Sequence, residues 1–191
     1  MVERKNEIFP ELFGTLEMGT DDKKWNIFHT KSRCEKKLAN IAYKNNIEYY
    51  LPLVDSYRVY ESKKAHFLKV LISGYFFTKC TLDEKNTLIK TGYTSNSLVV
   101  RNQEELVSDL KKIMNIRNIN LPMEEAQFLF EGYLVEIIDG PLIGLIGLIK
   151  NIENPEKFIV QVNVIKKAVS ITLSNNQFRL LRKIKKGEII E

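Results

Sequence analysis

The sequence contains few of the residues from which metal and redox sites are built. Among its 191 residues there are only two cysteines and two histidines. Cys34 and Cys80 fall in separate predicted elements and form no CxxC pair, so no metal site and no bound cofactor are predicted. So little cysteine is typical of a protein of the reducing cytoplasm.

Long apolar runs are missing as well. The N-terminus has no apolar core of the kind that a signal peptide requires, and nowhere do about 18 apolar residues follow one another. Residues 132–149, GYLVEIIDGPLIGLIGLI, come nearest, but Glu136 and Asp139 interrupt them. We therefore expect a cytoplasmic protein that does not bind a membrane.

A catalytic constellation is also lacking. No spacing or nucleophile turn singles out a serine, and His29 and His66 lie far apart in the sequence. Cys34 falls on the apolar side of a predicted helix, which is typical of a core thiol. No catalytic residue is predicted, and the chain is not expected to be an enzyme.

What the sequence does carry is a moderate excess of basic residues. There are 29 Lys and Arg against 24 Asp and Glu, which gives a net charge of +5 and a pI near 9.0. This balance favours an acidic partner such as nucleic acid without identifying one, and a basic surface without a partner is the alternative. The hydrophobic share of 44% is sufficient for one medium domain or two small ones.

The first half of the chain mixes helical and strand patterns. Residues 1–23 show no period and are expected to form a flexible extension. Trp25 begins a strand period, and Ser32 with Glu35 forms the capping box of a following helix. The later runs predict an antiparallel meander of four strands over 47–82, a short helix over 83–92, a last strand over 97–101 and a helix over 102–114.

The second half of the chain changes to short strands. The helical period is lost around Pro122, and we expect a linker over 116–129. Five short strands follow over 130–182, and each is too narrow to bury a face alone, which favours a small closed barrel. The sequence therefore predicts an α+β fold, with a mixed domain over 24–115, an all-β barrel and a frayed tail over 183–191.

Gly140, Gly144 and Gly147 are grouped within the apolar stretch. They do not form a dinucleotide-binding loop, because GxGxxG needs a strand before it and a long helix after it, and here more strands follow. The lysine and hydroxyl of a P-loop are missing too. We therefore interpret these glycines as structural: DGP forms a tight turn, and the later glycines let strands bend sharply.

Two groups of motifs resemble those of one known family. The first is W…HTKSRCEKKL…YLPLV…LISGYFF and the second is EGYLVEIIDGPLIGLIGLI…FRLL. Both resemble the NusG family of transcription elongation factors and follow its order, an N-terminal NGN domain of antiparallel sheet and flanking helices, a linker and an SH3-like KOW barrel. The resemblance implies a factor that binds RNA polymerase and promotes processive elongation.

Two departures from the family pattern look like a specialised paralogue of the RfaH or UpxY sort. The usual FPGY is replaced by ISGY, with Ser73 in place of proline, and the glycine-rich segment that often precedes the last helix of the first domain is missing. Such paralogues imply antitermination in specific long operons, for example those for polysaccharide biosynthesis. The alternative function is a KOW-domain protein that binds RNA or the ribosome in translation.

The resemblance also implies a polymerase-binding face. Side chains alternate along the strand GYFF, so Tyr75 and Phe77 share one side and Phe76 lies on the other. By the resemblance, Tyr75, Phe77 and Val100 dock on the clamp helices of RNA polymerase. The alternative is that all three are ordinary core residues.

Basic residues gather in the predicted hairpin before GYFF and ahead of the first helix. They are Arg58, Lys63, Lys64, His66, Lys69, Lys31 and Arg33. Aromatic residues interleave with the charges of the hairpin and could stack on unpaired bases, and the resemblance places this hairpin near the non-template DNA strand of the transcription bubble. The alternative is a solvated edge whose lysines prevent pairing with another sheet.

The turn of the predicted barrel carries large apolar residues. Leu142, Ile143 and Leu145 are expected to be exposed beside it, and the resemblance implies that they bind a second protein, either a small-subunit ribosomal protein or Rho. We expect the chain itself to be a monomer.

Overall fold

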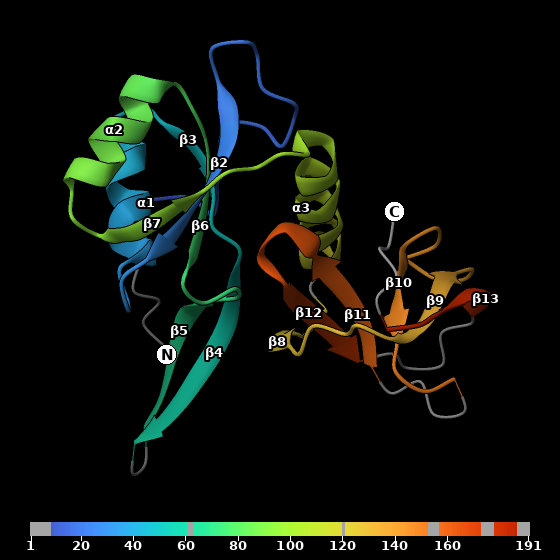
Figure 1. The fold of residues 1–191 in the computed structure, drawn as a ribbon. Helices are drawn as coiled ribbons and strands as arrows, with labels where there is room; N and C mark the ends of the chain where they lie inside the picture. The colour runs from blue at the N-terminus through green and yellow to red at the C-terminus, as the bar shows by residue number, and fades with distance from the viewer. Residues whose placement is uncertain (1–8, 61–62, 120, 153–156, 173–177, 187–191) are drawn as a thin grey trace. The chain divides into compact units, whose positions relative to one another are not determined.

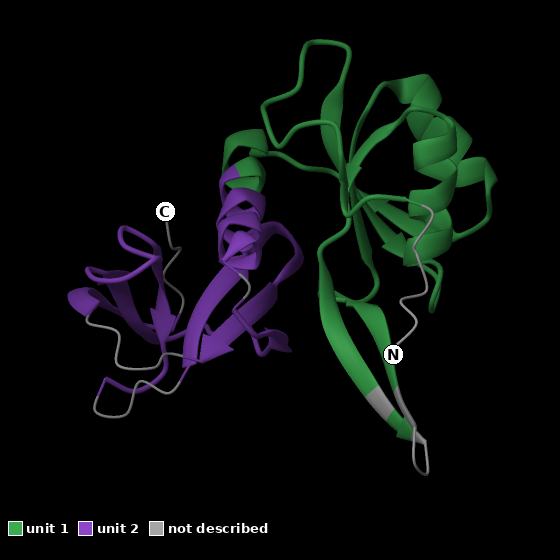
Figure 2. Cartoon of the chain, turned by 180° about the vertical axis from the view of Figure 1, so that it is seen from behind, with its two compact units in different colours: residues 1–107 green, residues 108–191 purple. Residues whose placement is uncertain are grey.

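The computed structural model has an α+β fold with two compact units, residues 1–107 and residues 108–191 (Figure 2). The sheets of both units are antiparallel. The structure describes residues 9–60, 63–119, 121–152, 157–172 and 178–186.

Unit 1 is built on a five-stranded sheet with the strand order β1-β3-β6-β2-β7. Two helices, α1 (Glu35–Lys44) and α2 (Leu82–Lys90), pack on one face of this sheet (Figure 1). The strands are β1 (Leu12–Phe13), β2 (Lys24–Thr30), β3 (Glu48–Tyr50), β6 (Tyr75–Cys80) and β7 (Thr94–Leu98).

The core between the helices and the sheet confirms the apolar periods of the sequence. Leu38 and Ala42 of α1 and Leu88 of α2 are fully buried with Phe28 and Phe76 of the sheet. Burying a side chain as large as leucine or phenylalanine contributes about 1.5–3 kcal/mol. The last strand was expected at 97–101, and it instead ends at Leu98, before the exposed Val99.

β4 (Leu53–Tyr60) and β5 (Lys63–Val70) form a separate two-stranded hairpin that extends away from the five-stranded sheet (Figure 1). The expected four-stranded meander is therefore wrong, since only β3 and β6 of its runs join the main sheet, where they pair with each other. The physical reason is polarity. Asp55 and Tyr57 are exposed in the middle of β4, and neither would be well placed inside a sheet covered by helices.

The N-terminal segment is folded from Phe9 onward, which corrects the expectation of a flexible extension over 1–23. Phe9 and Leu16 are buried, and β1 pairs with β3. The indole Nε1 of Trp25 donates a hydrogen bond to the carbonyl oxygen of Glu17 at 2.9 Å. Residues 1–8 lie outside the described residues.

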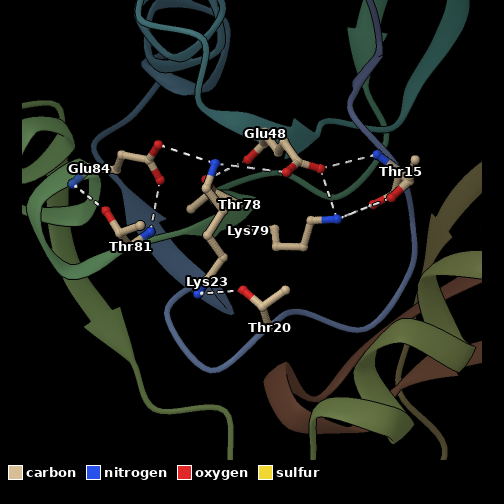
Figure 3. Close-up of polar contacts among 8 residues, drawn as sticks. All are labelled: Thr15, Thr20, Lys23, Glu48, Thr78, Lys79, Thr81 and Glu84. Carbon is tan, nitrogen blue, oxygen red and sulfur yellow. Dashed lines mark hydrogen bonds and ion pairs between the residues drawn. The ribbon is translucent and has the colours of Figure 1, made fainter.

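A buried lysine ties this segment to the sheet (Figure 3). Lys79 is 6% exposed, and its Nζ lies 2.8 Å from Glu48 Oε2 and donates to the carbonyl and hydroxyl oxygens of Thr15 at 3.2 and 3.1 Å. Thr15 N donates to the same Glu48 oxygen at 3.3 Å. Because a buried ammonium group needs such partners, these contacts order a segment that has no period in its sequence.

The two helices of unit 1 begin differently from the prediction. α1 begins at Glu35 after Cys34, which makes no side-chain cap, so the predicted Ser32–Glu35 capping box is wrong. The capping box lies at α2 instead, where Glu84 N donates to Thr81 Oγ1 at 3.2 Å and Thr81 N donates to Glu84 Oε2 at 2.8 Å. The carboxylate of Glu35 has a different partner, described below.

α3 (Gln103–Asn118) crosses the boundary between the units and ends later than the predicted residue 114. Unit 2 then forms a six-stranded sheet with the order β13-β9-β10-β11-β12-β8. Its elements are β8 (Met123–Ala126), β9 (Gly132–Ile137), β10 (Ile146–Ile149), β11 (Lys157–Val162), the 3-10 helix η1 (Asn163–Ile165), β12 (Lys167–Thr172) and β13 (Phe178–Ile184).

Two segments that were expected to be irregular belong to this sheet. The predicted linker over 116–129 contains β8, in which the buried Met123 lies opposite Ile171 of β12. The predicted tail over 183–191 begins inside β13, where the buried Ile184 lies opposite Gly132. The described part of unit 2 therefore has the five predicted strands, β9 to β13, with β8 added to their sheet beside β12.

The glycines of residues 132–149 have two distinct structural roles. Gly140 and Gly144 have φ values of +80° and +83°, with nothing close to the position of an added Cβ, so it is the backbone conformation that favours glycine there. At Gly147, an added Cβ would lie 2.5 Å from Phe158 Cζ and 2.7 Å from the carbonyl oxygen of Ile159. Close packing of β10 against β11 therefore requires glycine at this position.

Candidate functional site

The predicted docking residue Tyr75 is the first residue of β6, which pairs with β2. The strands pair so that His29 is directly opposite Tyr75, and the two rings meet edge to face with centroids 5.2 Å apart. His29 is exposed and Tyr75 is half-buried. The pair therefore leaves aromatic surface accessible to solvent.

Phe77 differs from Tyr75 although both lie on the same side of β6. It is opposite Ile27 of β2 and Tyr50 of β3, and all three side chains are at most 1% exposed. Val100 is half-buried, and its carbonyl oxygen accepts a hydrogen bond from Gln103 Nε2 at 3.3 Å. In this structure Tyr75 and Val100 reach the surface, whereas Phe77 does not.

A serine that the sequence did not single out orients His29. Ser95 Oγ donates to the carbonyl oxygen of His29 at 3.0 Å and lies 2.7 Å from His29 Nδ1. A hydroxyl has one hydrogen to donate, so in this arrangement Nδ1–H donates to Ser95 Oγ. The ring that flanks Tyr75 is therefore fixed by its neighbour in β7.

Next to this pair lies an open cleft of about 600 Å³ between the start of α1 and the base of the hairpin. Its lining includes the cationic residues Arg33, Lys36 and Lys69 together with His29. Lys31, which stands between the lining residues Thr30 and Ser32 in the chain, is exposed. The structure thus brings the predicted basic residues Arg33 and Lys69 together from segments that are far apart in the sequence.

A buried carboxylate fixes the wall of the cleft. Glu35 is 6% exposed, and its Oε1 accepts a hydrogen bond from Gly74 N at 2.7 Å. Gly74 has a φ of +83°, and its carbonyl oxygen accepts from Thr30 N at 2.8 Å. Glu35 therefore connects the start of α1 to the turn before Tyr75, which is why it does not cap the helix.

Lys36, on α1, is a further basic residue of the cleft lining. Its Nζ donates to the carbonyl oxygen of Leu68 in β5 at 2.6 Å. Its neighbour Lys37 has a ring contact instead, with its Nζ 5.4 Å from the centroid of Tyr93. The sequence signal for Lys36 is its place in the basic run around Arg33, but only the fold shows which side chains of that run face the hairpin.

The hairpin does not keep all of its predicted basic residues on one side. His66 lies opposite Tyr57, with ring centroids 5.0 Å apart, and its Nε2 is 2.6 Å from Asp55 Oδ1. Lys69 is three positions further along β5, so strand alternation places it on the other face, towards the cleft. The side chains of Arg58, Lys63 and Lys64 lie outside the described part of the structure.

The three apolar residues of the predicted partner-binding loop in unit 2 differ in exposure. Ile143 is 70% exposed and Leu145 is half-buried, whereas Leu142 is only 5% exposed. The expectation that all three are exposed is therefore wrong for Leu142. The hydrogen bond from Leu145 N to the Leu142 carbonyl oxygen, at 2.9 Å, belongs to the turn that folds Leu142 inward.

Neither a metal site nor a membrane-spanning helix is found among the described residues. No group of three or more His, Cys, Asp or Glu side chains is placed there to hold a metal ion. No helix in the same part of the chain is long and apolar enough to span a membrane.

Comparison with known proteins gives one family. The family model described as "Transcription termination factor nusG" matches residues 23–118, which are 96 of the 191 residues. No curated protein matches the chain. A solved chain described as "Crystal Structure of MjSpt4:Spt5 complex conformation B" is 18% identical, with 84% of this chain and 99% of that chain covered and a TM-score of 0.29. At this TM-score the likeness carries no argument about function.

Proposed function

The chain belongs to the NusG family of transcription factors, and we propose that it binds the clamp helices of RNA polymerase and promotes processive elongation. The observation that carries this proposal is the adjacency of two surfaces in unit 1. His29 contacts the ring of Tyr75 and also lines the basic cleft with Arg33 and Lys69. The face that we propose for the polymerase and the cleft that we propose for DNA are thus adjacent at His29.

Each surface suits its proposed partner physically. A half-buried tyrosine can bury its ring in a protein groove while its hydroxyl stays hydrated, and such residues supply most of the affinity of an interface. The cations of the cleft suit the phosphates of the non-template DNA strand and steer association. A factor that binds the closed, elongating polymerase better than the paused one would favour elongation by that difference in affinity.

The more specific parts of the proposal concern the operon and the second partner. We propose a specialised RfaH- or UpxY-like factor that acts in antitermination of long operons, such as those for polysaccharide biosynthesis. Unit 2 would act as a KOW domain, with the exposed Ile143 as its contact with a small-subunit ribosomal protein or Rho. ISGY in place of FPGY and the side chain of Ile143 support these assignments.

The test is binding of purified RNA polymerase by variants of the full chain. Tyr75→Ala should weaken binding at least about tenfold, because an aromatic anchor of an interface is lost. Tyr43→Ala removes another partly exposed tyrosine of unit 1, at 37% exposure on α1, and should leave binding unchanged. Equal affinity of the Tyr75 variant and the wild type would contradict the docking surface.

A pausing assay with purified RNA polymerase on a transcribing complex tests the role of the cleft. Arg33→Gln combined with Lys69→Gln should reduce elongation past pause sites while binding to polymerase alone is preserved. Lys44→Gln, at the exposed end of α1, is the charge control. Wild-type pausing by the double variant would exclude the cleft from the mechanism.

A further inference from the structure

We propose that the cleft of unit 1 binds a phosphate monoester, the terminal phosphate of a nucleotide or of a strand end, in preference to the phosphodiester of a continuous strand. Such a ligand competes with DNA for the cations of the cleft, so the proposal rests on the proposed function and adds a regulator to it. The cleft volume of about 600 Å³ lies within the range of small-ligand pockets, roughly 300–1,000 Å³. The cleft is therefore large enough for a whole nucleotide.

A buried hydroxyl without a partner lies in the wall of the cleft. Thr30, the last residue of β2, is 3% exposed and belongs to the lining. Its backbone N donates to the carbonyl oxygen of Gly74 at 2.8 Å, whereas its Oγ1 has no hydrogen-bond partner within the described part of the chain. Since buried polar groups in proteins are nearly always hydrogen-bonded, this hydroxyl marks a place where an oxygen of a ligand supplies the partner.

Strand alternation directs the Thr30 side chain towards α1. Thr30 lies on the same side of β2 as Phe28, and Phe28 is buried in the cluster that includes α1. The helix begins after Cys34 without a side-chain cap, and its first backbone bond runs from Leu38 N to the Cys34 carbonyl oxygen. The amides before Leu38 lie at the positive end of the helix dipole, which favours a bound phosphate. The helix start and the Thr30 hydroxyl therefore favour the same ligand.

The charge of the cleft favours a dianion over a monoanion. Among the described lining residues, Arg33, Lys36 and Lys69 are cationic and Glu35 is the one carboxylate, which leaves an excess of two positive charges. The carboxylate already accepts a hydrogen bond from Gly74 N at 2.7 Å. A phosphate monoester carries about two negative charges at neutral pH, whereas each phosphodiester of a strand carries one. The monoester therefore neutralises the cleft, and a diester does so only by half.

The number of free oxygens gives a second reason for a terminal phosphate. A monoester has three oxygens that accept hydrogen bonds, so it can bond to the Thr30 hydroxyl, to the helix start and to a lysine at once. A diester has two such oxygens, and its strand continues on both sides. Ser32 and Ser73 are exposed lining residues that add hydroxyl donors, and the half-buried Leu68 and Val70 provide apolar surface for a sugar or base.

The experiment is isothermal titration calorimetry of the full chain with two nucleotides that share the same base and sugar. 5′-AMP carries a phosphate monoester, and 3′,5′-cyclic AMP carries a diester. 5′-AMP should bind at least about tenfold more tightly, because its second negative charge interacts with the excess positive charge of the cleft. Inorganic phosphate should displace it.

Thr30→Val tests the buried hydroxyl by replacing it with a methyl group of similar shape. The affinity for 5′-AMP should fall about tenfold, as for the loss of a hydrogen bond to a charged group. The thermal transition should stay unchanged or rise, because an unsatisfied buried polar group has been removed. Thr87→Val, which removes an exposed hydroxyl of α2, is the matched control and should leave affinity unchanged. Lys69→Gln, at an exposed position, should weaken binding even if Thr30→Val does not fold.

Two single-stranded DNA oligonucleotides identify the source of the monoester. Both have 12 nucleotides of the same sequence, and they differ only in carrying a 5′-phosphate or a 5′-hydroxyl end. Tighter binding of the phosphorylated strand than of 5′-AMP assigns the cleft to a strand end. Equal affinity of the two assigns it to a free nucleotide.

Two results would each contradict the monoester site. The first is 5′-AMP that binds no better than cyclic AMP, together with equal affinity for the two oligonucleotides. The second is wild-type affinity for 5′-AMP in both Thr30→Val and Lys69→Gln. The pausing assay with Arg33→Gln and Lys69→Gln tests the proposed function separately. If that double variant fails to support elongation and no monoester binds, the cleft serves DNA alone.

Discussion

Cys80 shows how the position of one residue in the core changes its chemistry. It ends β6, is 2% exposed and belongs to the core between the sheet and the two helices. Burial raises the pKa of its thiol from 9.0 to about 11, with a smaller rise from Glu84 and opposing effects of Thr78 and nearby lysines. Burial, reinforced by the neighbouring Tyr43, also raises the pKa of Tyr49.

These shifts predict a loss of stability in alkaline solution. Because the folded state holds the thiol of Cys80 neutral more strongly than the unfolded chain does, its contribution is complete below pH 9 and is lost as the pH rises to about 11. The loss should be about 2 kcal/mol in the free energy of unfolding. Urea titrations at pH 8, 9.5 and 11 measure it.

Cys80→Ala serves as the reference for this prediction. The variant is less stable at every pH because it leaves a cavity, but its stability should fall less between pH 8 and 11. Parallel curves for the variant and the wild type would show that Cys80 does not titrate in this range.

At the scale of elements, the starts of the two helices illustrate local and distant control. α2 begins with a reciprocal capping box, Thr81 with Glu84, which the sequence around it can specify by itself. α1 lacks one because Glu35 bonds to Gly74, a residue in the turn before β6. The same residue pattern therefore gives different structures at two sites.

Removing the capping hydroxyl of α2 should destabilise unit 1 measurably. Thr81→Ala should lower the free energy of unfolding by about 1 kcal/mol, because an amide at the first turn loses its acceptor. Thr87→Ala is the control in the same helix, since the Thr87 hydroxyl donates only to the carbonyl oxygen of Asp83, one turn earlier. The two variants are compared by their denaturant midpoints, provided that the m-value is unchanged. Equal losses in the free energy of unfolding for both substitutions would argue against the capping box.

At the scale of the whole molecule, each unit contains a buried cluster of its own. One cluster joins α1, α2 and the five-stranded sheet, and another, with Leu148, Ile159, Ala168 and Ile184, lies within unit 2. A substitution that disturbs one of these clusters should therefore affect its own unit first.

Gly147→Ala tests this separation. The added methyl group meets Phe158 and the backbone of Ile159, so unit 2 should lose about 1–3 kcal/mol through overpacking. Hydrogen exchange followed by mass spectrometry should show faster exchange in β9 to β12, with β2 and β6 unchanged. Ile143→Ala, in the same unit, is the silent control, and faster exchange throughout unit 1 would contradict independent cores.

The sequence by itself determined the elements with strong local signals. The alternation around Trp25, the helical period of Leu38 and Ala42, and the change to short strands after Pro122 depend on neighbours in the chain, and they predicted the α+β fold. DGP likewise specified a turn at Gly140. The motif around Tyr75 was enough to select this residue as a candidate for docking, but it did not predict how exposed the side chain is.

Only the tertiary structure decided the arrangements that depend on distant partners. It ordered the N-terminal segment through Lys79 and Glu48, added β8 to the sheet of unit 2, and buried Phe77 while leaving Tyr75 at the surface. It also joined Arg33 to Lys69 in one cleft. The physical reason is that burial, ion pairing and sheet edges are properties of groups that meet in space, and spacing along one chain does not specify which groups meet.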